Sequence, residues 1–264
     1  MIVNKEFAKQ IEICIKQSHI NVAQKHAELG LESDILSIGS GAACFLGKDS
    51  FLSQVVGWGF DSDIKAISEQ LRSVEKFYLK NNFPTVNIEL SPLCGSDIAN
   101  LLSEQGYLVT ELSNISWLAL DNYLPKQSDG TEIVSLANPA SLAEWAKQVA
   151  IGFGCPEASA QFLVYAQAKN IFPFQVLLTG EIAAGSTIAM HEQFCDLGVT
   201  STVPEHRGKG LQKALIQARL AWAKQQGAKF AIVTTEPGSI SDANIQKLGF
   251  KTAYTRIKFS KQLT

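Results

Sequence analysis

The stretch VPEHRGKGLQKALI, residues 203–216, places a basic loop with two glycines directly before a helical pattern. The apolar segment 195–203 before the loop is predicted to be a strand, and 210–227 a long helix with one apolar stripe. Gly208 and Gly210 permit backbone conformations and close approaches that a Cβ would block. A helix start also offers unpaired N–H groups and the positive end of the helix dipole. The loop therefore predicts a phosphate site, with an ordinary strand-to-helix turn carrying solvated charges as the alternative.

The loop is not a Walker loop, because the pattern GxxxxGK[ST] is absent. A second glycine-rich segment, GSGAAC (39–44), begins like the dinucleotide fingerprint GxGxxG, but Cys44 occupies the position of the third glycine. No helical pattern starts inside it. We therefore interpret 39–44 as a structural turn.

The composition indicates a folded chain without a polyanionic partner. The chain has 264 residues, 46% hydrophobic and 18% charged, with a formal net charge of −2. A nucleic-acid or anionic-membrane partner would normally require a basic surplus, so neither is expected. No apolar run reaches the roughly 18–20 residues of a membrane span, and the N-terminus lacks the features of a secretory signal. The five cysteines are widely spaced and odd in number, which favours reduced core residues, no metal site and a cytoplasmic location.

Patterning predicts two similar halves. Helices are expected at 5–29 (one or two helices), 61–82, 96–107, 138–150, 156–169, 210–227 and 241–250, and strands at 35–47, 51–60, 85–90, 112–120, 174–179, 182–192, 195–203, 229–235 and 252–259. In each half a long helix leads to a strand, a short Ser-Asp helix ending in Gly-aromatic, and another strand. The polar stretch DNYLPKQSDG (121–130) is the best linker candidate.

Residues 197–261 resemble the core of the GNAT N-acetyltransferase superfamily. The superfamily signature, Arg/Gln-x-x-Gly-x-Gly/Ala after a strand, is matched by TVPEHRGKG (202–210), with Arg207 and Gly210 at its defining positions. KLGF (247–250) matches the later helix that ends in Leu-Gly-Phe. Gln212 departs from the signature by occupying its final Gly/Ala position.

The resemblance implies an α/β (α+β) fold with a mixed, mostly antiparallel sheet flanked by helices, in two GNAT-like halves. Residues 1–125 would be a degenerate domain without the phosphate loop, and 126–264 the acetyltransferase domain. It also implies that acetyl-CoA binds with its pyrophosphate on the loop and its pantetheine arm along a bulged, splayed strand at 195–203. The implied cofactor-binding residues are Thr200, Thr202, Val203, Arg207, Gly208, Lys209, Gly210, Leu211, Gln212 and Asn244, the last with a helix-surface role as the alternative.

Acyl transfer to an amine needs a base, because an alkylamine with a pKa of about 10.4 is protonated at neutral pH. Asp196 is the first candidate, on one face with Gly198, Thr200 and Thr202 by period-two alternation. A solvated strand-end carboxylate is its alternative role. Glu192 and His191 are the next candidates, whereas His206 is interpreted as an exposed loop histidine.

The leaving thiolate is helped by an acid. Many members of the superfamily carry a tyrosine four residues before the glycine of Leu-Gly-Phe, but Ile245 stands there in this chain. Tyr254 is the nearest aromatic hydroxyl in sequence, with a core or rim role as its alternative. Ser239 and Ser241 either contact the cofactor or cap the short helix.

The sequence leaves three functions open. The first is an N-acetyltransferase that moves an acetyl group from acetyl-CoA to a primary amine of a small molecule or peptide. The second is a catalytically weak acyl-CoA-binding or sensing module, suggested by Gln212 and Ile245. The third is a nucleotide-phosphate binder unrelated to acyl transfer. Neither the acceptor nor the oligomeric state follows from the sequence.

Overall fold

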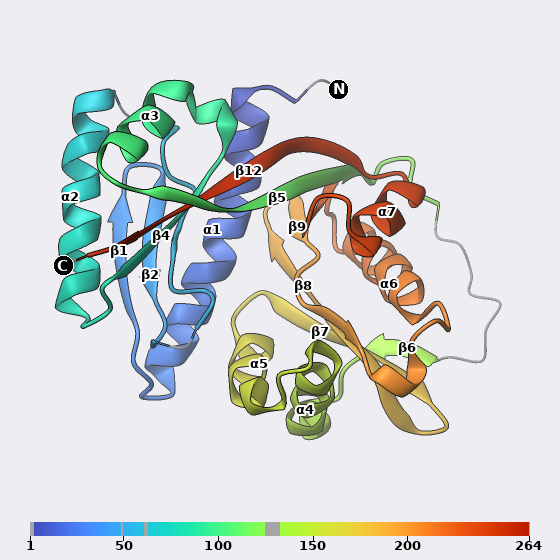
Figure 1. Ribbon diagram of the computed structural model, residues 1–264. Helices are drawn as coiled ribbons and strands as arrows, with labels where there is room; N and C mark the ends of the chain where they lie inside the picture. Colours follow the sequence, from blue (N-terminus) through green and yellow to red (C-terminus); the bar gives the residue numbers. More distant parts are fainter. Residues whose placement is uncertain (1–2, 49, 61–62, 125–132, 264) are drawn as a thin grey trace. The chain divides into compact units, whose positions relative to one another are not determined.

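The computed structural model describes residues 3–48, 50–60, 63–124 and 133–263. The chain forms two compact units, which are described separately: unit 1 comprises Met1–Ser116 and Thr234–Thr264, and unit 2 comprises Trp117–Val233. Both contain helices packed on mostly antiparallel strands, so the predicted fold class is confirmed (Figure 1).

The elements have the following bounds. Unit 1 contains α1 (Lys5–Glu28), β1 (Asp34–Ile38), β2 (Gly41–Phe45), β3 (Val55–Val56), α2 (Ile64–Lys80), β4 (Thr85–Leu90), α3 (Ser96–Glu104), most of β5 (Leu108–Ala119), α7 (Ile240–Lys247) and β12 (Lys251–Gln262). Unit 2 contains β6 (Ile133–Leu136), α4 (Leu142–Phe153), α5 (Ser159–Gln167), β7 (Ile171–Leu178), β8 (Glu181–His191), β9 (Phe194–Asp196), β10 (Thr200–Thr202), α6 (Leu211–Gln225) and most of β11 (Phe230–Thr235).

The C-terminal strand lies in the sheet of the N-terminal elements. The strand order in unit 1 is β1-β2-β3-β4-β12-β5. β12 is antiparallel to β4, with a register that runs from Ile257 opposite Leu90 to Gln262 opposite Thr85. No single cut in the chain therefore separates the two units. The division into two GNAT-like domains, 1–125 and 126–264, stays a prediction.

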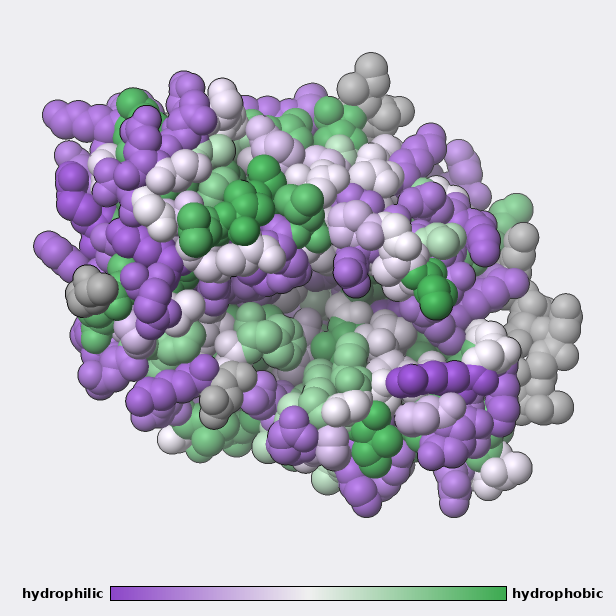
Figure 2. All heavy atoms as spheres, in the orientation of Figure 1, coloured by the Kyte–Doolittle hydropathy of each residue, from purple (hydrophilic) through white to green (hydrophobic). Residues whose placement is uncertain are grey.

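Side-chain alternation on β4 builds the two faces of unit 1. Val86, Ile88 and Leu90 belong to a core cluster with buried residues of α2 and α3. Glu89 points to the other face, where Arg256 Nε lies 2.8 Å from its Oε2. Arg256 Nη1 also lies 3.7 Å from Glu12 Oε2 of α1, so α1 covers this second face. Figure 2 shows the hydrophilic outer surface of α2, which matches its single apolar stripe.

Unit 2 has helices on both faces of its strands, which follow the order β11-β9-β8-β7-β6, with β10 also paired to β8. α4 packs closely on one face, because a Cβ at Gly185 of β8 would lie 2.5 Å from Val149 Cγ2. Trp222 of α6 packs on the other face, where its ring contacts Phe172 and Phe174 of β7. This arrangement holds β8, β9 and β10 between α4 and α6.

Several sequence predictions need correction. The expected strand at 51–60 is reduced to Val55–Val56, because the flanking residues are buried without joining a ladder. Asp63 caps α2 by accepting from the Ala66 N–H, whereas the first two residues of the helix expected at 61–82 lie outside the described residues. β6 was not predicted. Residues 125–130 of the proposed linker also lie outside the described residues.

Other predictions are confirmed. Segment 39–44 is the turn and second strand of the β1–β2 hairpin. A Cβ at Gly41 would lie 2.7 Å from the Trp58 backbone, so close packing requires glycine at this position. All five cysteines are free, and three of them are buried.

Candidate functional site

A β-bulge divides the strand before the basic loop. Asp196 of β9 lies opposite Ala189 of β8, and Thr200 of β10 lies opposite Ser186. Four steps along β9–β10 (200 − 196) therefore oppose three along β8 (189 − 186), so one extra residue lies within 197–199. The parallel pairing of β9 with β11 ends beside the bulge, where the Leu197 N–H donates to the Ile232 carbonyl at 2.9 Å. The strand thus has the bulge that the resemblance implied.

The bulge reverses which side chains share a face. Residue 185 of β8 faces α4, and so does Ser201, whose hydroxyl donates to the Val149 carbonyl at 2.9 Å. Alternation along β8 puts Ala189, and hence Asp196, on the same α4 side. Thr200 and Thr202 point to the opposite side. The prediction that Asp196 shares a face with both threonines is therefore wrong, because a strict period of two assumes no bulge.

Gly198 sits in the bulge against two side-chain oxygens. A Cβ on Gly198 would lie 2.9 Å from both Thr187 Oγ1 and the Tyr165 hydroxyl, so only glycine fits without movement. Thr187 is fully buried, and its Oγ1 has no hydrogen-bond partner within the described part of the chain. A buried unpaired hydroxyl and a phenol beside a strand bulge are suited to contact a polar ligand.

Arg219 of α6 contacts the backbone of β8 at Thr187. Its guanidinium is buried, and Nη1 donates to the Thr187 carbonyl at 2.7 Å while Nε donates to Leu215 at 3.2 Å. Burial lowers the Arg219 pKa to about 9, which Cys195 and Asp196 partly oppose. Sequence reasoning missed Arg219, although a lone arginine in the apolar stripe of the 210–227 helix was a signal. It also missed Tyr165 and Thr187, for which the sequence offers no comparable signal.

The basic loop forms a turn followed by two left-handed glycines. Residues Pro204–His206 make a 3₁₀ turn, and Gly208 and Gly210 have φ of +77° and +78°. Gly210 is the N-cap of α6. A Cβ at either glycine would meet no protein atom within 4 Å, so the backbone conformation and not internal packing requires glycine. The space in front of both glycines is open.

The loop presents donors toward this open space. Within the described residues, the backbone N–H groups of Gly208, Lys209 and Gly210 have no acceptor. The Arg207 guanidinium donates to the Gly152 carbonyl at 2.8 Å and thereby fixes the loop to the end of α4. Lys209 Nζ lies 3.1 Å from His206 Nδ1, so His206 contacts a cation of the loop. Unpaired N–H groups at a helix start form an anion site.

The remaining predicted residues occupy other positions. Glu192 is exposed at the turn between β8 and β9, with a φ of +49°, and His191 ends β8. Asn244 is half-buried on α7. Ser239 is the N-cap of α7, because its hydroxyl accepts from the Asp242 N–H at 3.1 Å. Ile245 is 1% exposed, so the position of the missing tyrosine is filled by an apolar core residue.

Tyr254 lies in the buried charged network of unit 1. Its hydroxyl donates to Glu12 Oε1 at 2.9 Å, and burial raises the Tyr254 pKa well above its usual value. Burial likewise raises the pKa of Glu12, against the attraction of Arg256. The hydroxyl thus has a structural partner, and the role of Tyr254 as an acid stays a prediction.

Residues 140–250 match the model of the acetyltransferase (GNAT) family. This part of the chain is therefore similar to the GNAT family. A comparison with curated protein sequences found no match.

Solved structures extend the likeness of the GNAT fold to most of the chain. A GCN5-related N-acetyltransferase from Kribbella flavida is 16% identical with a TM-score of 0.66, over 92% of this chain and 95% of that one. A GCN5-related N-acetyltransferase from Sphaerobacter thermophilus is 14% identical with a TM-score of 0.63, over 87% and 76%. A tandem GNAT protein from the clavulanic acid biosynthesis pathway is 15% identical with a TM-score of 0.62, over 88% and 82%. At these identities the likeness concerns the fold.

Across the described ranges, no helix combines the length and the hydropathy that crossing a bilayer requires. Nor do the described residues bring together three or more His, Cys, Asp or Glu side chains that could hold a metal ion.

Proposed function

We propose that the protein is an acetyl-CoA-dependent N-acetyltransferase that acts on a primary amine of a small molecule or peptide. The observation that carries the proposal is the succession of bulge, strand and donor loop along residues 196–211 of unit 2. The GNAT family match over 140–250 includes this whole succession.

The residues of the loop fit a bound pyrophosphate. Unpaired N–H groups at Gly208, Lys209 and Gly210 face open space at the positive end of α6, and Leu211 begins the helix. Lys209 adds a cation, and Arg207 fixes the loop to α4. Thr200, Thr202 and Val203 would line the pantetheine arm, with Gln212 in the first helical turn, and the cofactor contact of Asn244 stays a prediction.

Acetyl-CoA, when bound, supplies the acetyl group as an activated thioester. Asp196 is our candidate base, because it ends β9 at the bulge and is half-buried on the α4 side of the strand. Its carboxylate would accept the proton of the incoming amine. Tyr165 is our candidate for the donor of a proton to the departing sulfur, because its hydroxyl lies beside Gly198. The sequence-based candidate for that donor, Tyr254, is the alternative.

A catalytically weak acyl-CoA-binding module is the second candidate function. The buried Ile245 favours it, because this side chain cannot supply the proton that the usual tyrosine donates. The loop geometry is common to both functions, so only turnover separates them.

The experiment incubates the full chain with acetyl-CoA and a library of primary amines, and follows the release of free thiol. Turnover that falls in Asp196→Asn and Tyr165→Phe is expected. CoA binding without turnover on any amine would establish the binding module instead. Gly210→Asp should abolish CoA binding, because its carboxylate would face the pyrophosphate, and unchanged CoA affinity would refute the loop assignment.

A further inference from the structure

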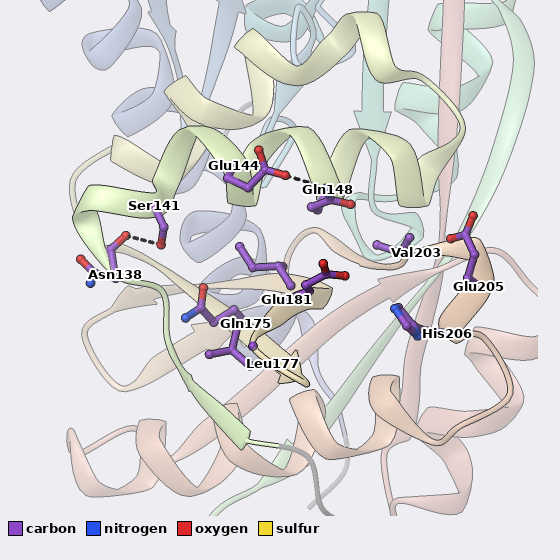
Figure 3. A pocket seen from close by; sticks show the side chains of 12 residues that line it. Asn138, Ser141, Glu144, Gln148, Gln175, Leu177, Glu181, Val203, Glu205 and His206 are labelled. Atoms are coloured by element: carbon purple, nitrogen blue, oxygen red, sulfur yellow. Dashed lines mark hydrogen bonds between the residues drawn. The ribbon is translucent and has the colours of Figure 1, made fainter.

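A polar groove of about 660 Å³ lies in unit 2 beside the basic loop. α4, the β7–β8 hairpin and the turn at Pro204–His206 form its walls (Figure 3). Its volume is within the range of about 300–1,000 Å³ that small-molecule sites occupy. The lining is richer in hydrogen-bonding groups than a typical apolar ligand pocket, so a polar ligand is indicated.

Three carboxylates give the rim of the groove a negative charge. They come from separate elements: Glu144 from α4, Glu181 from the first residue of β8, and Glu205 from the turn before the loop. No lysine or arginine is among the described residues that line the groove. Carboxylates around one cavity attract a cation, and part of this attraction is screened by salt because the three side chains are exposed.

The neighbouring cations leave most of this charge uncompensated. Lys147 Nζ lies 3.8 Å from Glu144, one turn along the same helix. Within the described ranges, Glu181 and Glu205 have neither an ion pair nor a hydrogen-bond donor. Lys209 contacts His206 at the end of the groove, where the loop begins. The groove therefore retains two carboxylates that a ligand can pair.

A buried acceptor lies at the floor of the groove. Gln175 of β7 is 6% exposed, and its Oε1 has no hydrogen-bond donor among the residues that the structure describes. Figure 3 shows the Gln175 amide directed to the space beneath α4, on the side of Asn138 and Ser141. The backbone of Gln175 is fixed by pairing with Gly185. An unpaired buried oxygen needs a donor, and an ammonium N–H forms the stronger, charge-assisted kind of hydrogen bond.

The spacing of the carboxylates argues against a metal ion. Neither these three glutamates nor any other group of three or more His, Cys, Asp or Glu side chains among the described residues could hold a metal ion. Separated carboxylates instead match separated positive charges on one flexible ligand. We propose that this groove binds a small linear polyamine, with one ammonium group hydrogen-bonded to Gln175 Oε1 and another paired with Glu181 or Glu205.

The test is isothermal titration of the full chain with spermidine at low salt and without CoA, so its outcome does not depend on acetyl transfer. We expect saturable binding that weakens about fivefold in the double variant Glu181→Gln/Glu205→Gln, since the second ammonium group loses its exposed carboxylate partner. Gln175→Leu should also weaken binding, because it removes the buried acceptor. Glu157→Gln, on an exposed glutamate outside the groove, should bind like the unaltered chain.

Added NaCl should weaken binding of spermidine, and 1,6-hexanediol, which has a similar chain without charge, should not bind. The far-ultraviolet circular dichroism of each variant verifies the fold. Absence of spermidine binding would overturn the proposal, as would equal affinity in the double variant and in Glu157→Gln. A lysine-rich peptide that binds more tightly than spermidine would overturn the assignment to a small ligand.

Discussion

Replacing Gly210 by alanine tests whether the loop binds phosphate, apart from its effect on the stability of the fold. Gly210 has a φ of +78°, and a Cβ there would meet no protein atom within 4 Å. The substitution should therefore cost about 1–2 kcal/mol of stability, from backbone strain alone. It should also place a methyl group in the open space before α6 and turn one N–H away from a bound phosphate. Loss of one charge-assisted hydrogen bond, about 1.5–3 kcal/mol, weakens CoA binding roughly 10–100-fold.

The matched control is Gly227→Ala at the other end of the same helix. Gly227 has a φ of +91°, and a Cβ there also has no protein atom within 4 Å. It should cost a similar free energy of unfolding without touching the loop. The two variants thus share the backbone strain and differ in the phosphate contact.

Urea unfolding with and without CoA measures both effects. At a CoA concentration of 100 times the Kd of the unaltered protein, binding should add about 2.7 kcal/mol to the free energy of unfolding. At the same CoA concentration, Gly210→Ala should gain only about 0.4–1.4 kcal/mol, and Gly227→Ala the full amount. Equal gains in both variants would refute the assignment of the loop to the pyrophosphate.

Three further changes test other parts of the chain. Tyr254→Phe should lower the free energy of unfolding by about 1–3 kcal/mol, because buried Glu12 loses a donor, and should leave kcat unchanged; a fall in kcat with unchanged stability would restore Tyr254 as the acid. Gly198→Ala should cost about 1–3 kcal/mol and lower kcat, because its Cβ would lie 2.9 Å from the Tyr165 hydroxyl; wild-type kcat and stability would contradict this role of the bulge. Burial lowers the His19 pKa from 6.5 to about 4, because it disfavours the protonated imidazole. The contribution of neutral His19 to the free energy of unfolding is therefore complete above pH 6.5 and is lost as the pH falls toward 4. The stability advantage of the unaltered chain over His19→Gln should accordingly shrink by about 3 kcal/mol between pH 7 and pH 4, and a constant difference in urea titrations would refute it.

The sequence predicted the elements whose burial follows a regular period. α2 and α6 were found because their apolar residues repeat at helical spacing, and the loop before α6 because two glycines and several basic residues directly precede a helical pattern. β6 was not predicted, because the apolar residues at its two ends, Ile133 and Leu136, are exposed and give no pattern of buried side chains.

The site was predicted less completely, and for a geometric reason. One inserted residue at 197–199 moves Asp196 to the opposite face from Thr200, and no local pattern marks a bulge. Tyr165 reaches Gly198 from a helix more than thirty positions earlier (198 − 165 = 33), so only tertiary structure brings them together. The pairing of β12 with β4 could not be predicted either, because alternation of apolar and polar residues indicates a strand but not the strand that it pairs with.

The position of β12 dictates an order of events during synthesis. The Thr85 hydroxyl donates to Gln262 Oε1 across 177 positions of sequence, so the sheet of unit 1 remains incomplete until β12 leaves the ribosome. Until then β4 lacks its neighbour and presents an unpaired edge. Unit 2 is one continuous segment and has all its residues earlier. Although domains usually fold from the N-terminus onward, the middle of this chain is thus able to finish folding before its beginning.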